Sequence, residues 1–306
     1  MPNVDVSLQK QGPPLVEGRV FTLDVKDTGS SVWLGPAWAV LCGAVASGGL
    51  ALDWRSLVSL LLAVILTDAV LGSVWRLASG GRRPWLRKAI GKPGGKLPGS
   101  RGRRFLAYLK GRARHWRGQV WPRAGTSMLG LGFLLLLALA IAAALGGAAL
   151  LLTIGALGVA TWRQALISRE GSLSAALGSC YLAGLPWLIG WAAFGSFEWA
   201  RSELIPLAQA LGWAAAYALT FHAYRMLGGQ RLSTGANLLV AAHVAVVALL
   251  IVARQPILAG CVALLLLTQL MLQPALLKLG EGAWYLRRVQ VFTMLAMMVA
   301  AVAMVA

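Results

Sequence analysis

Long apolar runs, separated by short polar stretches, recur along the chain from about residue 32 to its last residue. Each run is near the roughly 20 residues that a helix needs to cross the apolar core of a bilayer. The pattern predicts an all-α membrane protein with about nine transmembrane helices in a single domain over residues 32–306. The runs cover residues 32–52, 56–76, 127–145, 147–162, 173–195, 206–226, 235–253, 257–277 and 289–306.

The boundary between the third and fourth runs is the one that decides the topology. Residues 127–162 form one uncharged stretch up to Arg163, and we divide it at Gly146-Gly147. Without a break at this point the count is eight, and every later loop changes sides.

Composition supports the membrane class. The chain of 306 residues is 58% hydrophobic and only 12% charged, and its mean hydropathy is +0.71. A soluble chain carries about twice that charge. Residues 1–31 form a polar N-terminal segment that does not resemble a signal peptide, so we expect the first apolar run to direct insertion. Three separate cysteines in apolar runs, Cys42, Cys180 and Cys261, favour core packing over a metal site.

Positive charge orients the nine-helix topology. The loops after the even-numbered runs hold 22 Lys and Arg residues, whereas the loops on the opposite side hold three. Basic loops stay in the cytoplasm. The sequence therefore predicts a multi-pass protein of the cytoplasmic (inner) membrane with a cytoplasmic N-terminus.

Most of this charge lies in one loop, at residues 77–126. From Arg76 to Arg123 there are 15 Lys and Arg residues and no acidic residue, and "RRFLAYLKGRARHW" within this stretch predicts a basic amphipathic helix on the membrane surface. The first interpretation is that the loop fixes topology and attracts anionic lipid on the cytoplasmic side. The second is that it docks on a larger membrane complex. Nucleic-acid binding has the charge but no supporting fold or motif, so we do not expect it.

One acidic residue falls inside an expected span. Asp68 lies in "ILTDAVLGSVW", toward the cytoplasmic end of the second run. A carboxylate at membrane depth is costly and is by default a functional candidate. The structural alternative is an ion pair with a loop arginine such as Arg76.

Nine spans with a cytoplasmic N-terminus and this stretch resemble the UbiA superfamily of intramembrane prenyltransferases, and most closely its chlorophyll and bacteriochlorophyll synthase branch. That branch carries N-D-x-x-D-x-x-x-D at the cytoplasmic end of the second span. Here Asp68 keeps the first acid, while Leu71 and Trp75 occupy the second and third acid positions.

The second motif of that branch, N-D-F-K followed by G-D-R, is similar to "HAYRMLGGQRLSTGANLLVA" after the sixth run. His222 and Ala223 replace Asn and Asp, Tyr224 and Arg225 keep the aromatic and the base, and Gln230 replaces the Asp before Arg231. The resemblance implies a UbiA-like bundle. It also implies a ligand pocket lined by Asp68, Trp75, His222, Tyr224, Arg225, Gln230 and Arg231.

This chain lacks most of the acidic residues of the two family motifs, and these residues are needed for catalysis in the family. In the family, two acidic motifs hold Mg²⁺ ions that neutralise a diphosphate leaving group. Magnesium requires carboxylate oxygens, and only the remnant Asp68 is left. We therefore expect no bound Mg²⁺ and a non-catalytic protein that binds a carotenoid, a (bacterio)chlorophyll or a quinone. Such a protein can serve as a subunit or assembly factor of a membrane pigment complex of photosynthesis.

Two other functions stay open: a working prenyltransferase of the (bacterio)chlorophyll synthase type with unusual Mg²⁺ ligation, and a transporter. A transporter usually shows an internal repeat, and none is convincing here.

Two histidines, His222 and His243, are candidate axial ligands for the magnesium of a bound pigment, since a neutral imidazole can ligate a metal. Hydrogen bonding between helices is the alternative for each. In the same way Trp187, Trp191 and Trp213 either line a cavity or pack between helices.

Overall fold

The computed structural model describes residues 35–79, 121–166, 172–195, 204–228, 231–279 and 282–305, and every regular element in these ranges is helical. The described helices form nine continuous segments, as the sequence predicted. Three are single helices in the first half of the chain: α1 (Pro36–Ala46), α6 (Trp121–Leu145) and α7 (Gly147–Leu166). Two contain a π-helical stretch: α2 (Trp54–Val64), η2 (Ile65–Leu71) and α3 (Gly72–Ser79), then α8 (Ser172–Ser179), η4 (Cys180–Gly184) and α9 (Leu185–Phe194). The last four are α10 (Leu204–Gly228), α11 (Leu232–Val252), α12 (Pro256–Leu279) and α13 (Gly282–Ala303).

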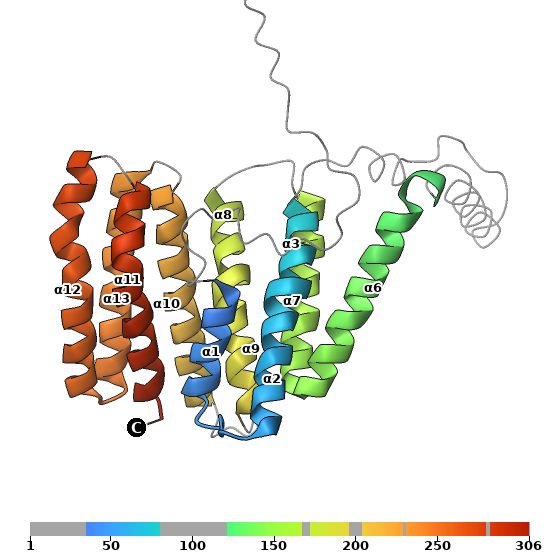
Figure 1. Ribbon diagram of the computed structural model, residues 1–306, viewed down its shortest axis with the longest axis horizontal. Helices are drawn as coiled ribbons and strands as arrows, with labels where there is room; N and C mark the ends of the chain where they lie inside the picture. The colour runs from blue at the N-terminus through green and yellow to red at the C-terminus, as the bar shows by residue number, and fades with distance from the viewer. Residues whose placement is uncertain are drawn as a thin grey trace, which may run out of the picture.

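The break between α6 and α7 confirms the division of the uncharged run. Gly146 alone separates the two helices, and its φ of 119° lies in the left-handed region that favours glycine. The chain reverses here, so α6 and α7 run antiparallel (Figure 1).

Three helices differ most in extent from the runs that predicted them, and one of these is α13, which begins at Gly282, ahead of the expected residue 289. The first run, 32–52, contains a described helix of only 11 residues, α1, which ends where the Ser47 hydroxyl donates a hydrogen bond to the Ala44 carbonyl at 2.6 Å. In contrast α6 begins at Trp121, ahead of the expected residue 127, because Pro122 and Arg123 are both compatible with a first helical turn. The rest of the basic loop expected at 77–126, with its amphipathic helix, lies outside the described residues, as does the segment 1–31.

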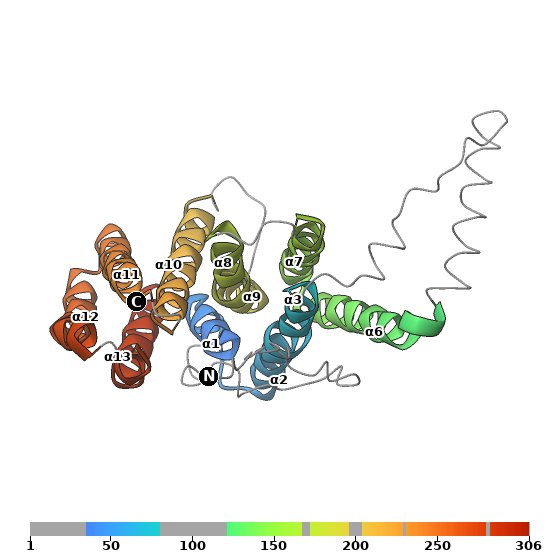
Figure 2. The same ribbon diagram turned by 90° about the horizontal axis from the view of Figure 1, so that it is seen from above.

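The helices stand side by side in an elongated bundle, with α12 at one end and α6 at the other (Figures 1 and 2). The rod α8–η4–α9 and the short α1 lie between the two halves.

The buried side chains form two hydrophobic clusters that meet at this central pair. One cluster joins α1 and α9 to α10–α13 through residues such as Cys42 and Trp187. The other joins α2–α3, α6 and α7 and includes Val40 of α1 and Ile189 of α9. Helices α1 and α9 therefore contribute one face to each cluster and hold the two halves together.

Helix length and apolar surface identify a multi-pass membrane protein. Five helices of the described chain are long and apolar enough to cross a bilayer. They cover Trp54–Arg76, Ala175–Phe194, Leu232–Val252, Pro256–Leu276 and Trp284–Ala303. Large apolar side chains such as Phe133, Leu151 and Met271 are exposed on the flanks of the bundle, where they can contact the acyl chains of lipids.

Arginines gather at one edge of the bundle, which we call the basic edge. Helices α3, α7 and α10 end at this edge in Figure 1, and Arg76, Arg163 and Arg225 lie in their last turns. A cation in the last turn also interacts favourably with the helix dipole. The described arginines at the opposite edge are Arg55, at the start of α2, and Arg254, after α11.

Candidate functional site

A groove of about 550 Å³ runs along the flank of the bundle over the rod α8–η4–α9. Residues 151–159 of α7 form one wall, residues 211–218 of α10 form the other, and residues 177–188 of the rod form the floor. Nearly all of its lining is apolar. Because Leu151, Gly155, Cys180 and Leu211 in this lining are exposed, the groove opens sideways, along the flank of the helices.

The floor of the groove is shaped by the π-helical stretch η4, which a proline explains. Pro186 has no N–H to donate to the carbonyl of Leu182, four residues earlier, so the regular α-helical ladder is interrupted just before α9. A π-helical turn is a common result of such an interruption and is frequent at functional sites. It places Cys180, Tyr181 and Gly184 on the floor of the groove.

At the basic edge the groove ends against an aromatic pair. The ring of Tyr181 stacks on the indole of Trp75, with centroids 4.4 Å apart and planes inclined by 24°. The guanidinium carbon of Arg163 lies 4.1 Å from the centroid of the Trp75 ring, a cation–π contact. Trp75 therefore joins the floor of the groove to the end of α7.

A second guanidinium approaches the same indole from α10. A Cβ atom added to Gly178 would lie 2.9 Å from Nη1 of Arg225 and 3.3 Å from Cζ2 of Trp75. Glycine at this position leaves room for both the Arg225 guanidinium and the edge of the Trp75 ring beside the backbone of α8. The next residue, Ser179, hydrogen-bonds through its hydroxyl to Nδ1 of His222 at 3.1 Å and fixes α8 to α10.

The two arginines lie close enough to repel each other. They also lie directly beyond the groove: Arg163 is four residues past Val159 of the lining, and Arg225 is seven residues past Ala218. These separations are about one and two helical turns, or about 6 and 11 Å. The site thus has an apolar body and a cationic head, the name we use for Arg163 and Arg225.

The structure brings together three of the residues that the sequence assigned to one pocket. Trp75, His222 and Arg225 all lie at the cationic head, linked through Gly178 and Ser179. Asp68 does not line the groove; it is half-buried in η2, in the same helical segment as Arg76, and its ion pair with Arg76 stays a prediction.

The other expected pocket residues lie elsewhere or outside the described chain. Tyr224 is buried and its hydroxyl meets Oγ1 of Thr293 on α13 at 2.5 Å, in the other direction from the groove. Arg231 is exposed at the start of α11, and Gln230 lies outside the described residues.

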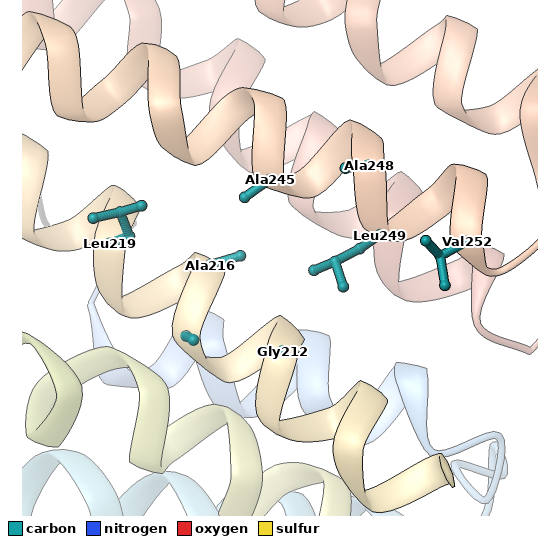
Figure 3. A pocket seen from close by; sticks show the side chains of 8 residues that line it. Gly212, Ala216, Leu219, Ala245, Ala248, Leu249 and Val252 are labelled. Carbon is teal, nitrogen blue, oxygen red and sulfur yellow. The ribbon is translucent and has the colours of Figure 1, made fainter.

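His243 is a buried residue of α11, 6% exposed, and neither ring nitrogen has a hydrogen-bond partner among the described residues. A shallow apolar depression of about 340 Å³ lies between α10 and α11 (Figure 3). Its lining includes Gly212, Ala216, Ala245 and Leu249, but not His243. The role of His243 as a pigment ligand stays a prediction.

Two of the deep tryptophans are packing residues. Trp187 and Trp213 are 1% and 2% exposed and belong to the cluster around α10–α13, where the Trp187 ring lies 6.0 Å from that of Tyr217. Trp191 packs against the same cluster while only partly buried.

Sequence reasoning did not assign Arg163, Tyr181 or Gly178 to the site. One signal was available, because Arg163, like Arg76 and Arg225, is a single arginine at the end of an apolar run on the basic side. No sequence pattern connects it to Trp75, which lies on another helix.

Comparison with known protein families, with characterised proteins and with solved structures gives no match to this chain. The UbiA resemblance rests on the two short stretches around Asp68 and Arg225 and stays a prediction. Among the residues that the structure describes, no group of three or more His, Cys, Asp or Glu side chains is placed to hold a metal ion.

Proposed function

We propose that this protein is a non-catalytic, UbiA-like membrane protein that holds an isoprenoid or tetrapyrrole ligand in the groove between α7 and α10. A carotenoid, a (bacterio)chlorophyll or a quinone is the class of ligand. The protein then serves as a subunit or assembly factor of a pigment-containing complex in the cytoplasmic membrane, with its basic edge toward the cytoplasm.

The observation that carries the proposal is the groove itself. Its volume of about 550 Å³ falls within the usual range for small-molecule sites, roughly 300–1,000 Å³. Its walls are leucine, alanine, glycine and valine, and Tyr181, toward the basic edge, is the only aromatic residue among the described residues of the lining. A long apolar chain fits this surface, and a polar substrate does not.

The residues at the second and third acid positions of the first UbiA-like motif support a non-catalytic protein. Leu71 and Trp75, which stand where carboxylates would bind Mg²⁺, are 1% and 5% exposed and belong to the hydrophobic cluster of α2–α3, α6 and α7. Arg163 places a positive charge over Trp75, where the family chemistry requires negative charge.

Two glycines of α7 provide the test. A Cβ atom at Gly155 or at Gly158 would meet nothing within 4 Å, so a larger side chain is tolerated by the fold at either position. Only Gly155 lines the groove. Leucine at Gly155 fills the groove, and leucine at Gly158 makes the same chemical change on the lipid-facing side of the same helix.

The experiment compares wild type, Gly155→Leu and Gly158→Leu, each purified gently from the native membrane. The absorption spectrum and mass analysis of a solvent extract identify the ligand and its ratio to protein. We expect a fixed ratio in wild type and Gly158→Leu and a loss of most of the ligand in Gly155→Leu. Bulk phospholipid alone in all three, or full ligand in Gly155→Leu, contradicts binding in this groove.

A working prenyltransferase is the second candidate, and the position of Asp68 near the basic edge favours it. The purified protein is incubated with a prenyl diphosphate, Mg²⁺ and candidate acceptors. Product formation that Asp68→Ala abolishes establishes the enzyme and rejects the non-catalytic protein.

A further inference from the structure

The cationic head brings two like charges together at the end of an apolar groove. Arg163 lies over the ring of Trp75, and the guanidinium of Arg225 and the edge of that ring both lie close to the backbone of Gly178. Two guanidinium groups at the same end of an apolar groove attract an anion more strongly than one does.

The Arg163 guanidinium is held in place before any ligand binds, because it lies over the indole of Trp75. Gly178 leaves room for the Arg225 guanidinium near the same indole. Pre-positioned side chains lose less conformational entropy on binding, which raises affinity. The planar fork of a guanidinium also matches the oxygens of carboxylate and phosphate groups.

The hydrogen-bonded pair Ser179 and His222 lies beside the arginines and adds polar atoms that can contact such oxygens. The lining residues Val159 and Ala218 connect the head to the apolar body within one or two helical turns. A single molecule can therefore occupy both parts.

We infer that the ligand of the groove is an amphiphile with an oxyanion head, a carboxylate or a phosphate, which Arg163 and Arg225 bind directly without a metal ion. The inference rests on the proposed function, that the groove holds a long apolar ligand. It favours a tetrapyrrole or isoprenoid that carries a free acid group over a neutral carotenoid or quinone.

The test uses three ligands that share one C20 chain and differ in the head: geranylgeraniol, geranylgeranoic acid and geranylgeranyl phosphate. Their affinities for the full chain are measured in nanodiscs of phosphatidylcholine. We expect both anionic ligands to bind about tenfold or more tightly than the alcohol, as charge-assisted hydrogen bonds of Arg require.

The variant Arg225→Gln removes one charge of the head at an exposed position, so the fold is retained. It should remove most of the preference for the anionic ligands and leave the affinity for geranylgeraniol unchanged. The matched control is Arg287→Gln, which removes the same charge from an exposed position of α13 and should keep the preference.

The outcomes separate the two proposals. Equal binding of all three ligands, or a preference that persists in Arg225→Gln, overturns the oxyanion head while the groove remains a ligand site. Binding of none of the three overturns the groove as well. A preference that disappears when excess phosphatidylglycerol is added supports the head and identifies bulk anionic phospholipid as its occupant, whereas a preference that persists identifies a single-chain ligand.

Discussion

Gly43 of α1 and Gly190 of α9 occupy reciprocal positions in the contact between these two helices. A Cβ atom on Gly43 would lie 2.0 Å from the Trp187 carbonyl oxygen, and a Cβ atom on Gly190 would lie 2.2 Å from the Val40 carbonyl oxygen. Each glycine thus lies against the backbone of the opposite helix, at the residue three positions before the opposite glycine. Small residues allow such close packing of membrane helices, and here they join the two halves of the bundle.

Gly190→Ala should destabilise the protein, because the added methyl group meets backbone atoms that cannot rotate away. Overpacking of this kind costs about 1–3 kcal/mol. The unfolding temperature in detergent should fall clearly. The control is Gly132→Ala on α6, where a Cβ atom meets nothing within 4 Å and helix propensity gains up to about 1 kcal/mol. An equal decrease in both variants would contradict close packing of α1 on α9 as the cause.

Thr293→Val should destabilise the half of the bundle formed by α10–α13. The Thr293 hydroxyl meets both the hydroxyl of Tyr224 and Nε2 of Gln269, so its loss leaves two buried polar groups without this partner, each at about 1–3 kcal/mol. Thr153→Val makes the same change on α7, where the hydroxyl donates only to the Ala149 carbonyl of its own helix at 2.8 Å. Thermal unfolding should therefore be affected much more in Thr293→Val. Equal stability of the two variants would show that the polar contacts of Thr293 are dispensable.

Trp75→Leu should weaken the binding of anionic ligands by removing the aromatic support of Arg163. A partly buried cation–π contact contributes about 0.5–2 kcal/mol, which corresponds to about a two- to thirtyfold loss of affinity. Trp284→Leu is the control, because Arg288 lies 4.9 Å from the Trp284 ring in a similar contact away from the groove. The affinity of geranylgeranoic acid is measured for both variants, and we expect it to fall in Trp75→Leu and to stay unchanged in Trp284→Leu. An equal loss in both would mean that Trp75 has no specific role at the head.

Asp53, at the edge opposite the basic edge, should make the stability of the protein depend on pH. Its carboxylate accepts a hydrogen bond from the backbone N–H of Ser56 at 2.9 Å, and hydrogen bonding by Ser56 lowers the pKa of this exposed carboxyl. A lowered pKa means that the carboxylate stabilises the folded state above the unfolded value of about 4, and that this contribution is lost as the pH falls through the folded pKa. Unfolding temperatures measured between pH 3 and 7 should therefore decrease at the acid end.

Asp53→Asn separates this effect from other acid-sensitive groups. Asparagine also caps helix N-termini but does not titrate, so the variant should lack the part of the decrease below about pH 4 that Asp53 causes. Identical pH profiles for wild type and variant would exclude Asp53 as a contributor.

The sequence was sufficient for those parts of the fold that local chemistry decides. Nine helical segments follow from apolar run length, and the reversal at Gly146 follows from a glycine pair that no side chain restrains. The basic edge follows from the distribution of arginine. In contrast η2 and η4 were not predicted, because a π-helical turn depends on which carbonyls find partners. In η2 the Thr67 hydroxyl donates to the Ala63 carbonyl at 2.9 Å, a contact that apolar periodicity does not reveal.

The site was predicted in part, for a geometric reason. His222 and Arg225 are three residues apart on α10 and therefore share a face, and both lie at the cationic head. Tyr224 was grouped with them by its place in a motif, but neighbouring positions on a helix point about 100° apart, and its side chain faces Thr293 instead. Arg163 joins the site only through contact with Trp75 on a distant part of the chain, and a single sequence carries no trace of such a contact.

The sideways opening of the groove determines how a ligand reaches it. Leu151 and Leu211 at its rim are exposed on the flank of the bundle, so an apolar molecule arrives by diffusion within the plane of the bilayer and never passes through water. Occupancy is then set by the mole fraction of the ligand among the surrounding lipids. Under the proposed function, a sparse pigment competes with every acyl chain that touches this flank, so the time that it stays in the groove depends on the lipid composition of the membrane.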